Sequence, residues 1–346
     1  MNTIMPKACC QRYTKKPASG FTLVELMVSI LIGLILLAVM GLAFLSNKQS
    51  YRAQDSSAQM QENGRYAIEV LTRDIRLAGY WGGFEHKVDS GKIIFPTGTI
   101  DPTTFGCDAT NWAKMASQRI YGLNDTNNDT SVTGNYSAAT CIPALPNGDV
   151  IVVRHASPNT FTTAELKTDG LYLKSDIDEM ALFTGITPPT EAKLGTPFQD
   201  PNTLQRVIAN AYFLGNSLVV CSDGGPTPGG PLLGLKRIGS TNATPVGPRE
   251  EIIGGVEDFQ VMYGVDNTND GTADLYVNAS ALVDWPNVVS VRIWLLLRAA
   301  CGESGYANTS TYTNPSGVAT TIASDSIRRQ VFTTTIFLRN PRYPSL

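Results

Sequence analysis

An apolar run near the N-terminus constrains this chain more than any other feature. Residues 21–45 form a predominantly apolar stretch whose only charged member is Glu25. As a helix this stretch would be about 37 Å long at 1.5 Å per residue, which exceeds the roughly 30 Å hydrocarbon thickness of a bilayer. The stretch therefore predicts a membrane-spanning helix. A carboxylate inside such a segment costs several kcal/mol, so Glu25 indicates a function.

The charges around the apolar run predict its orientation. Four basic residues and no acidic residue precede Gly20: Lys7, Arg12, Lys15 and Lys16. The positive-inside tendency keeps this end in the cytoplasm. Everything after Leu45 is then expected outside, which in a bacterial cell means the periplasm.

Two simpler explanations of the run leave features unexplained. A secretory signal has a shorter apolar region with small residues at a cleavage site after it, whereas Ala18, Ser19 and Gly20 come before this one. A plain signal anchor accounts for the length and the basic residues. It gives no reason for Glu25.

The residues GFTLVE, 20–25, followed at once by an apolar helix, resemble the class III signal of type IV pilins and type II secretion pseudopilins. The resemblance implies that residues 1–20 are a leader. A prepilin peptidase in the membrane would cut between Gly20 and Phe21 and methylate the new N-terminal Phe21. Glu25 would then be the fifth residue of the mature chain.

Cleavage would also explain the carboxylate. It creates a cationic amine at Phe21, about one helical turn from Glu25, so the two charges can offset each other. In a bundle of such helices, the Glu25 of an incoming subunit can meet the amine of its neighbour. The pairing would set the register of assembly, as a buried polar residue does in a coiled coil.

The helical pattern continues beyond the membrane, through residues 46–79. Apolar or small residues recur at three- and four-residue steps and predict a stripe that packs on a body: Met60, Gly64, Ala67, Ile68, Leu71, Ile75 and Ala78. Glu69 and Arg73 form an i,i+4 pair on another face, and Gly79 is expected to cap the end. The sequence predicts one helix of about 55 residues, roughly 80 Å long.

After residue 80 the pattern changes to alternating and β-branched runs. Nine strands are expected at 92–95, 149–156, 170–174, 206–214, 217–222, 234–239, 256–265, 287–299 and 329–340. A hairpin is expected through Gly215 and Asn216. Residues 97–146 are polar and loop-like, and predict a long excursion. The fold class is therefore α+β, a long N-terminal helix packed on an antiparallel β-rich domain at 80–346.

The cysteines indicate an oxidising compartment. Four of the six lie after the apolar run: Cys107, Cys141, Cys221 and Cys301. Outside the cytoplasm they would form two disulfides, and pairing in sequential order is one of three possible connectivities. Four separate buried thiols are the alternative. No C-x-x-C pair occurs and histidines number two, so zinc binding is poorly supported.

Several later segments resemble the PilW family of type IV pilus assembly proteins, which are minor pilins. They are GRYAIEVLTRDIRLAGYWG, VEDFQVMYGVD, WPNVVSVRIWLLLR and RRQVFTTTIFLRN. The resemblance implies a single-pass inner-membrane protein that enters an extracellular pilus. Its partners would be other minor pilins, the major pilin, the prepilin peptidase and the inner-membrane assembly platform. It would take part in pilus initiation near the tip, in support of adhesion, twitching motility or DNA uptake.

Two other functions stay open from the sequence. A J-type pseudopilin of type II secretion would be processed and assembled in the same way, but in a secretion apparatus rather than a pilus. A tip adhesin or DNA receptor would use residues 97–146, where Lys114 and Arg119 are the only basic residues. General nucleic-acid binding is not expected, because removing the four basic leader residues takes the net charge from −3 to −7.

One loop resembles half of a calcium site. Asp266, Thr268, Asp270 and Asp274 place oxygens at alternate positions around Gly271, as in an EF-hand loop. Val277 stands where the bidentate glutamate would be, so a simple Asn-Asp-Gly turn is the alternative. Calcium is a possible ligand, and no cofactor is expected to be required.

Catalytic patterns are scarce. No G-x-S-x-G, H-E-x-x-H or P-loop motif occurs, and His86 and His155 are the only imidazoles. His155 ends an expected strand and is interpreted as structural. An enzyme is therefore not expected.

Overall fold

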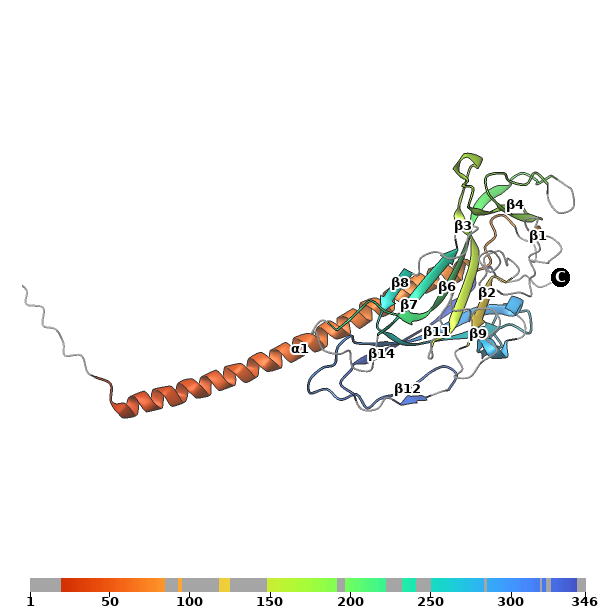
Figure 1. Ribbon diagram of the computed structural model, residues 1–346. Coiled ribbons are helices and arrows are strands. Elements are labelled where there is room, and N and C mark those ends of the chain that lie inside the picture. The colour runs from red at the N-terminus through yellow and green to blue at the C-terminus, as the bar shows by residue number, and fades with distance from the viewer. Residues whose placement is uncertain are drawn as a thin grey trace, which may run out of the picture. The chain divides into compact units, whose positions relative to one another are not determined.

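The computed structural model describes residues 20–84, 93–94, 118–124, 148–191, 197–221, 232–240, 250–282, 285–317, 319–321 and 325–340. The chain divides into two compact units, Met1–Arg52 and Ala53–Leu346. Helix α1 (Leu23–Leu77) contains 55 residues, as the sequence predicts. Figure 1 shows α1 and the strands that follow it.

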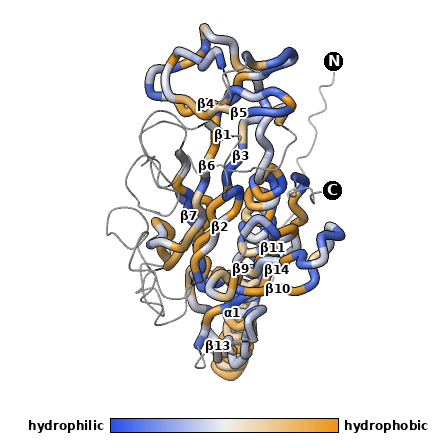
Figure 2. Tube along the Cα trace, turned by 90° about the vertical axis from the view of Figure 1, so that its right-hand side faces the viewer, coloured by the Kyte–Doolittle hydropathy of each residue, from blue (hydrophilic) through white to orange (hydrophobic). Residues whose placement is uncertain are grey.

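The first unit contains the apolar part of α1. Nearly every side chain from Phe21 to Leu45 is exposed, and the helix is long and apolar enough to cross a membrane. The colouring in Figure 2 marks this helix as largely hydrophobic. Such a surface needs lipid or other helices around it.

Among the described residues, the second unit contains the rest of α1 and three sheets. Within the described residues, the large sheet consists of β1 (Ile93–Ile94), β2 (Ile120–Leu123), β3 (Val150–Thr160), β4 (Leu171–Ser175), β5 (Met180–Thr184), β6 (Thr203–Asn216), β7 (Leu233–Ser240) and β8 (Glu250–Gly254). The second sheet has the order β10 (Leu275–Val277), β9 (Val256–Val265), β11 (Val288–Arg298), β14 (Arg329–Phe337). The third pairs β12 (Thr311–Thr313) with β13 (Ala319–Thr321). Short 3-10 turns lie at Thr163–Glu165, Ala279–Ala281 and Trp285–Asn287.

The pairing confirms an antiparallel β-rich domain. Only the short contact between β1 and β5 is parallel among the strand pairs of the described residues. In the large sheet β6 is central, because β3, β4 and β7 all pair with it. In the second sheet β11 pairs with β9 on one side and with β14 on the other.

The buried stripe of α1 belongs to a core that both larger sheets share. Met60, Ala67, Leu71, Ile75 and Ala78 pack with buried residues of β2, β3, β6, β9, β11 and β14. This confirms the predicted packing of the amphipathic half. A second cluster covers the other face of the large sheet, where Trp81 and Phe84 follow the helix.

Glycines shape both ends of this packing. Gly79 has φ +76° and ends the helix, as expected from a C-terminal cap. Gly64 has no room for a side chain, because a Cβ would lie 2.5 Å from the ring of Phe332 on β14. The helix therefore approaches β14 closely. The expected pair of Glu69 and Arg73 is not among the ion pairs of the described residues.

Eight of the nine expected stretches contain strands, and the ninth is wrong. Residues 217–221 form no strand, and Gly215 and Asn216 do not form a turn. Both lie inside β6, opposite Gly234 and Leu233 of β7. A two-residue hairpin turn needs positive φ, which Gly215 does not have. Pairing with β7 therefore extends β6 through the expected turn.

The expected excursion at 97–146 also needs correction. Residues 120–123 form β2, which pairs with β3 in the large sheet, and Ile120 is fully buried. The interval is therefore not loop throughout. Most of its other residues lie outside the described part of the chain.

Candidate functional site

The first turn of α1 holds the residues around the expected cleavage site. Gly20 and Phe21 are exposed and precede the helix. Thr22 caps it, because the Glu25 N–H donates to Thr22 Oγ1 at 3.3 Å and the Leu26 N–H donates to the Thr22 carbonyl at 3.1 Å. This cap was not predicted from the sequence, although Thr-x-x-Glu is a known helix-start pattern.

Glu25 thus has a local role as well as the expected one. A carboxylate in the first turn interacts favourably with the helix dipole, typically by about 0.3–1 kcal/mol. That is less than the several kcal/mol that a charge costs in hydrocarbon. In the described residues no cation forms an ion pair with the Glu25 carboxylate. Local effects therefore account for only part of the cost.

A buried carboxylate ties α1 to the large sheet. Asp74 continues the three- and four-residue spacing of the stripe, between Leu71 and Ala78, where an apolar residue is expected. Its Oδ1 lies 2.9 Å from His155 Nε2, and its Oδ2 accepts from the Tyr212 hydroxyl at 3.0 Å. The Asn210 amide donates to both oxygens, at 3.1 and 3.0 Å. We call these four residues the Asp74 cluster.

The Asp74 cluster satisfies polar groups from three elements in the core. His155 lies on β3, and Asn210 and Tyr212 lie on β6. Burial, and then the Asp74 carboxylate, raise the pKa of Tyr212 well above its ordinary value, so its hydroxyl stays a donor. His155 is buried, which agrees with the structural role expected for it. Asp74 could be noticed in the sequence by one sign, because it is a carboxylate on an apolar stripe.

A second polar contact lies nearer the middle of α1. Ser56 Oγ donates to Glu303 Oε1 at 2.8 Å, and Arg328 Nε donates to Glu303 Oε2 at 2.6 Å. The Arg328 guanidinium also lies 4.3 Å from the centre of the Tyr306 ring. Together with the Asp74 cluster, these contacts hold residues 56–74 of the helix at both ends of its buried stripe.

One expected disulfide is present. Cys221 and Cys301 are bonded across 80 residues of sequence, and this pair belongs to the sequential connectivity. Cys107 and Cys141 lie outside the described residues, as does His86. The confirmed bond joins the end of the β6 segment to the loop after β11.

The Asp266 loop forms a hairpin turn between β9 and β10. Asp266 accepts from the backbone N–H of Gly271 at 2.8 Å and of Asp270 at 3.3 Å. Asp274 accepts from the N–H groups of Asn267 at 2.6 Å and Thr268 at 3.1 Å. The main-chain donors thus satisfy these carboxylates without a metal.

The Asp270 carboxylate also accepts hydrogen bonds from within the turn. Hydrogen bonds from the Thr272 side chain and backbone lower the pKa of Asp270. In the part of the chain that the structure describes, no group of three or more His, Cys, Asp or Glu side chains is placed to hold a metal. Calcium binding by this loop stays a prediction. A melting temperature that falls in chelator would support it, and an unchanged curve would contradict it.

Arg119 is not available for a nucleic acid. Its Nη2 donates to the carbonyls of Val288 at 2.7 Å and Pro286 at 3.1 Å, and its Nη1 donates to the Asn340 carbonyl. The side chain therefore fastens β2 to the second sheet. Lys114 lies outside the described residues.

The comparisons with known proteins agree with this arrangement. Residues 15–41 match the family model of the prokaryotic N-terminal methylation motif, and residues 226–340 match that of type IV pilus-assembly protein W, PilW. These two matches support a pilin that resembles the PilW family of pilus-assembly proteins. No curated protein and no solved structure was found to match it.

The two family models match different parts of the chain. The methylation motif covers the expected cleavage site, Glu25 and most of the apolar run. The PilW region contains all of β7, the second sheet and Cys301. A prepilin signal with an apolar helix agrees with single-pass anchoring in the inner membrane and incorporation in a pilus. These families point to a structural protein rather than an enzyme.

Proposed function

We propose that this chain is a minor pilin that enters the type IV pilus through its N-terminal helix. The prepilin peptidase removes residues 1–20, and Phe21 becomes the methylated N-terminus. The observation that carries the proposal is Glu25, a carboxylate on an exposed apolar helix one turn after the expected cleavage site, with no ion pair to any described residue. The methylation-motif match supports the same assignment.

Assembly follows from the cost of that carboxylate. In lipid, a single subunit holds Glu25 in an apolar environment, which costs several kcal/mol. In the filament the carboxylate faces the cationic amine of a neighbouring Phe21, and both charges are compensated. The free-energy difference favours the assembled state and fixes the axial position of each helix.

The proposal also assigns a location and partners. Before assembly the chain spans the inner membrane with its body in the periplasm, where the Cys221–Cys301 bond can form. It meets the assembly platform, the major pilin and other minor pilins. It primes the filament near the tip, and thereby supports adhesion, twitching motility or DNA uptake.

Three variants separate pairing from helix capping. Glu25→Gln keeps the side-chain shape and removes the charge, and Glu25→Asp keeps the charge with a shorter reach. Thr22→Ala removes the cap and leaves Glu25 intact. We expect all three to be processed and Glu25→Gln to lower the amount in sheared pili more than tenfold, since about 1.4 kcal/mol corresponds to tenfold.

Thr22→Ala should stay near the wild-type amount in the same preparation. An equal loss in Thr22→Ala and Glu25→Gln would show that Glu25 acts through the helix start. Wild-type amounts of Glu25→Gln would reject the pairing.

A deletion strain distinguishes the pilus from a secretion machine. Surface pili are counted, and secretion of a type II substrate is measured in the same cultures. We expect pili to be lost and secretion to continue. Lost secretion with normal pili would instead assign the chain to the J-type pseudopilins.

A further inference from the structure

The outer strand of the second sheet has one open side. β14 pairs with β11, and within the described residues no other strand pairs with it. It is nine residues long, and its register with β11 has no shift. A long regular edge strand is a template for pairing with another chain.

The hydrogen-bond phase shows which backbone groups face the open side. The Leu338 N–H donates to the Val289 carbonyl, and the Ala299 N–H donates to the Arg328 carbonyl. In an antiparallel ladder, bonded and non-bonded pairs alternate. The even-numbered residues of β14 therefore bond to β11. The N–H and C=O groups of Val331, Thr333, Thr335 and Phe337 point away from it.

The same four residues have exposed side chains. Phe337 is 61 % exposed and Val331 is 37 % exposed. Soluble proteins protect such edges with lysine, proline, bulges or short strands. The stretch 330–337, QVFTTTIF, contains none of these. Its β-branched and aromatic residues instead favour strand pairing.

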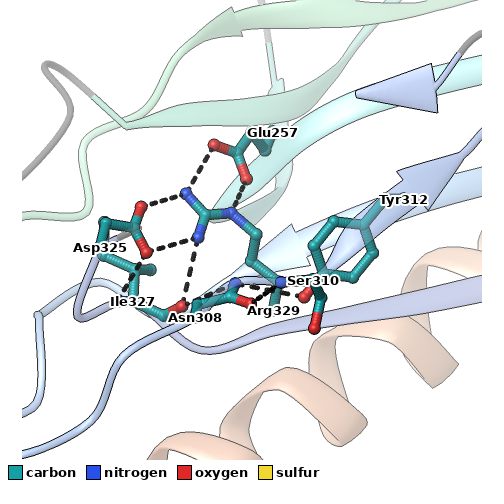
Figure 3. A network of polar contacts seen from close by, with 7 residues as sticks. All are labelled: Glu257, Asn308, Ser310, Tyr312, Asp325, Ile327 and Arg329. Atoms are coloured by element: carbon teal, nitrogen blue, oxygen red, sulfur yellow. Dashed lines mark hydrogen bonds and ion pairs between the residues drawn. The ribbon is translucent and has the colours of Figure 1, made fainter. Parts of the chain in front are cut away.

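The start of β14 is held in place by the Arg329 network. Figure 3 shows the Arg329 guanidinium between Glu257 of β9 and Asp325, which precedes the strand. Its Nη2 donates to Asp325 Oδ2 at 2.7 Å and to Glu257 Oε1 at 3.0 Å. Burial alone would lower the pKa of Arg329, but the hydrogen bonds to Asp325 and Glu257 raise it. With Phe332 packed on Gly64, the edge is fixed before any partner binds.

The end of β14 leads to a basic groove. Arg339 follows the strand and lines a hollow of about 720 Å³ together with Arg65, Arg73 and Arg76 of α1. Glu69 is the one acidic residue in its lining. All four guanidinium groups belong to exposed residues, and none forms an ion pair within the described residues. The groove suits an acidic segment.

We propose that the open edge of β14 takes up an extended strand from a neighbouring, different pilus subunit, with acidic residues at the end of that strand in the arginine groove. The proposal rests on the pilus incorporation argued above. A second copy of this chain is a poorer occupant, because residues 329–340 of its own edge contain no acidic residue for the arginine groove.

Hydrogen exchange tests the proposal with alternate residues as an internal control. Full-length chain from sheared pili is compared with the same chain as a detergent-solubilised monomer, with exchange resolved to single amides. The even-numbered amides 332, 334 and 336 should be slow in both. The amides of residues 331, 333, 335 and 337 should be fast in the monomer and slower by at least about tenfold in pili.

The possible results separate this proposal from the proposed function. Chain present in pili with fast odd-numbered amides overturns the strand pairing and leaves the minor pilin intact. Chain absent from pili overturns the proposed function itself. Protection of the odd-numbered amides in the monomer would show that the edge is already covered. Protection that grows with monomer concentration would show that a second copy is the occupant.

Variants test the two parts of the surface. Thr333→Pro removes an N–H that the subunit does not use, and edge strands tolerate such a proline. Thr333→Lys with Thr335→Lys is a second variant that leaves the backbone unchanged, and Thr333→Ala is the control. Both edge variants should fold with the Cys221–Cys301 bond and lose the protection. Wild-type protection in the folded variants would overturn the proposal.

Charge reversal tests the groove. In the wild-type chain, rising salt should weaken the protection of the odd-numbered amides in pili, because it screens the arginine groove. Arg73→Glu with Arg339→Glu should reduce this protection and remove its dependence on salt. Lys167→Glu is a control that reverses one exposed cation away from the groove, in the loop before β4. Equal effects of the two charge reversals would remove the acidic end from the proposal.

Discussion

Replacing Asp74 tests how α1 is held on the body. Asp74→Ala removes the acceptor of three buried donors, the Nε2 of His155, the amide of Asn210 and the hydroxyl of Tyr212. It also removes a carboxylate that is itself costly to bury. The two effects oppose each other, so their magnitudes decide the sign.

The stability lost through the three unsatisfied donors is expected to exceed the stability gained by removing the buried carboxylate. Each buried donor left without an acceptor costs about 1–3 kcal/mol, and three of them cost roughly 3–9 kcal/mol. Removal of the buried charge raises the free energy of unfolding by several kcal/mol, because that charge no longer has to be desolvated. When one partner of a buried ionic contact is removed, the free energy of unfolding typically falls by about 3–5 kcal/mol. At roughly 2–3 °C per kcal/mol for a domain of this size, the melting temperature should fall by about 6–15 °C.

The assay is thermal unfolding of the detergent-solubilised mature chain, followed by near-UV circular dichroism. Asp74→Asn keeps one oxygen acceptor and should lose about half as much. Tyr212→Phe combined with Asp74→Ala should show a coupling of about 1 kcal/mol, because the two share one hydrogen bond. An Asp74→Ala chain that melts at or above the wild-type temperature would refute the reasoning.

Three further changes have directions that follow from the structure. Gly64→Ala gains about 1 kcal/mol of helix propensity but forces the phenylalanine ring of β14 to move, at about 1–3 kcal/mol, so denaturant unfolding should show a small net loss that Gly41→Ala does not. Cys301→Ser should lower the unfolding free energy by about 2–4 kcal/mol, and Cys221→Ser should match it, whereas unequal losses would argue against their bond. Hydrogen bonds from Arg329 lower the pKa of Asp325, so its stabilising contribution is present above the ordinary carboxylate pKa of about 3.9 and is lost as pH falls below about 4. The melting difference between wild type and Asp325→Asn should therefore shrink below that pH, and a constant difference would contradict the ion pair.

Sequence alone could predict the helix because its pattern is local. Charges, apolar length and the three- and four-residue spacing extend over one continuous segment, and Gly79 ends it. The long strands β9 and β11 were equally readable, since each is a run of β-branched and aromatic residues. The N-terminal methylation motif could be recognised because its residues are contiguous in the sequence.

Other features depended on partners distant in sequence. The extension of β6 through Gly215 is set by β7, which pairs with it residue by residue. The acceptors of Arg119 are carbonyls more than a hundred residues away. The hydrogen-bond partners of Asp74 are His155, Asn210 and Tyr212, which lie 81, 136 and 138 residues away in the sequence. The open edge of β14 likewise follows from sheet order, which the local pattern does not encode.

The proposed pairing of Glu25 requires cleavage between Gly20 and Phe21, and one mass measurement tests this cleavage. The N-terminal peptide of the chain recovered from sheared pili is identified by mass spectrometry. We expect it to begin at Phe21 and to carry one methyl group on its amine. A chain that works in pili while it retains residues 1–20 would contradict the account, because Glu25 would then have no neighbouring amine to pair with.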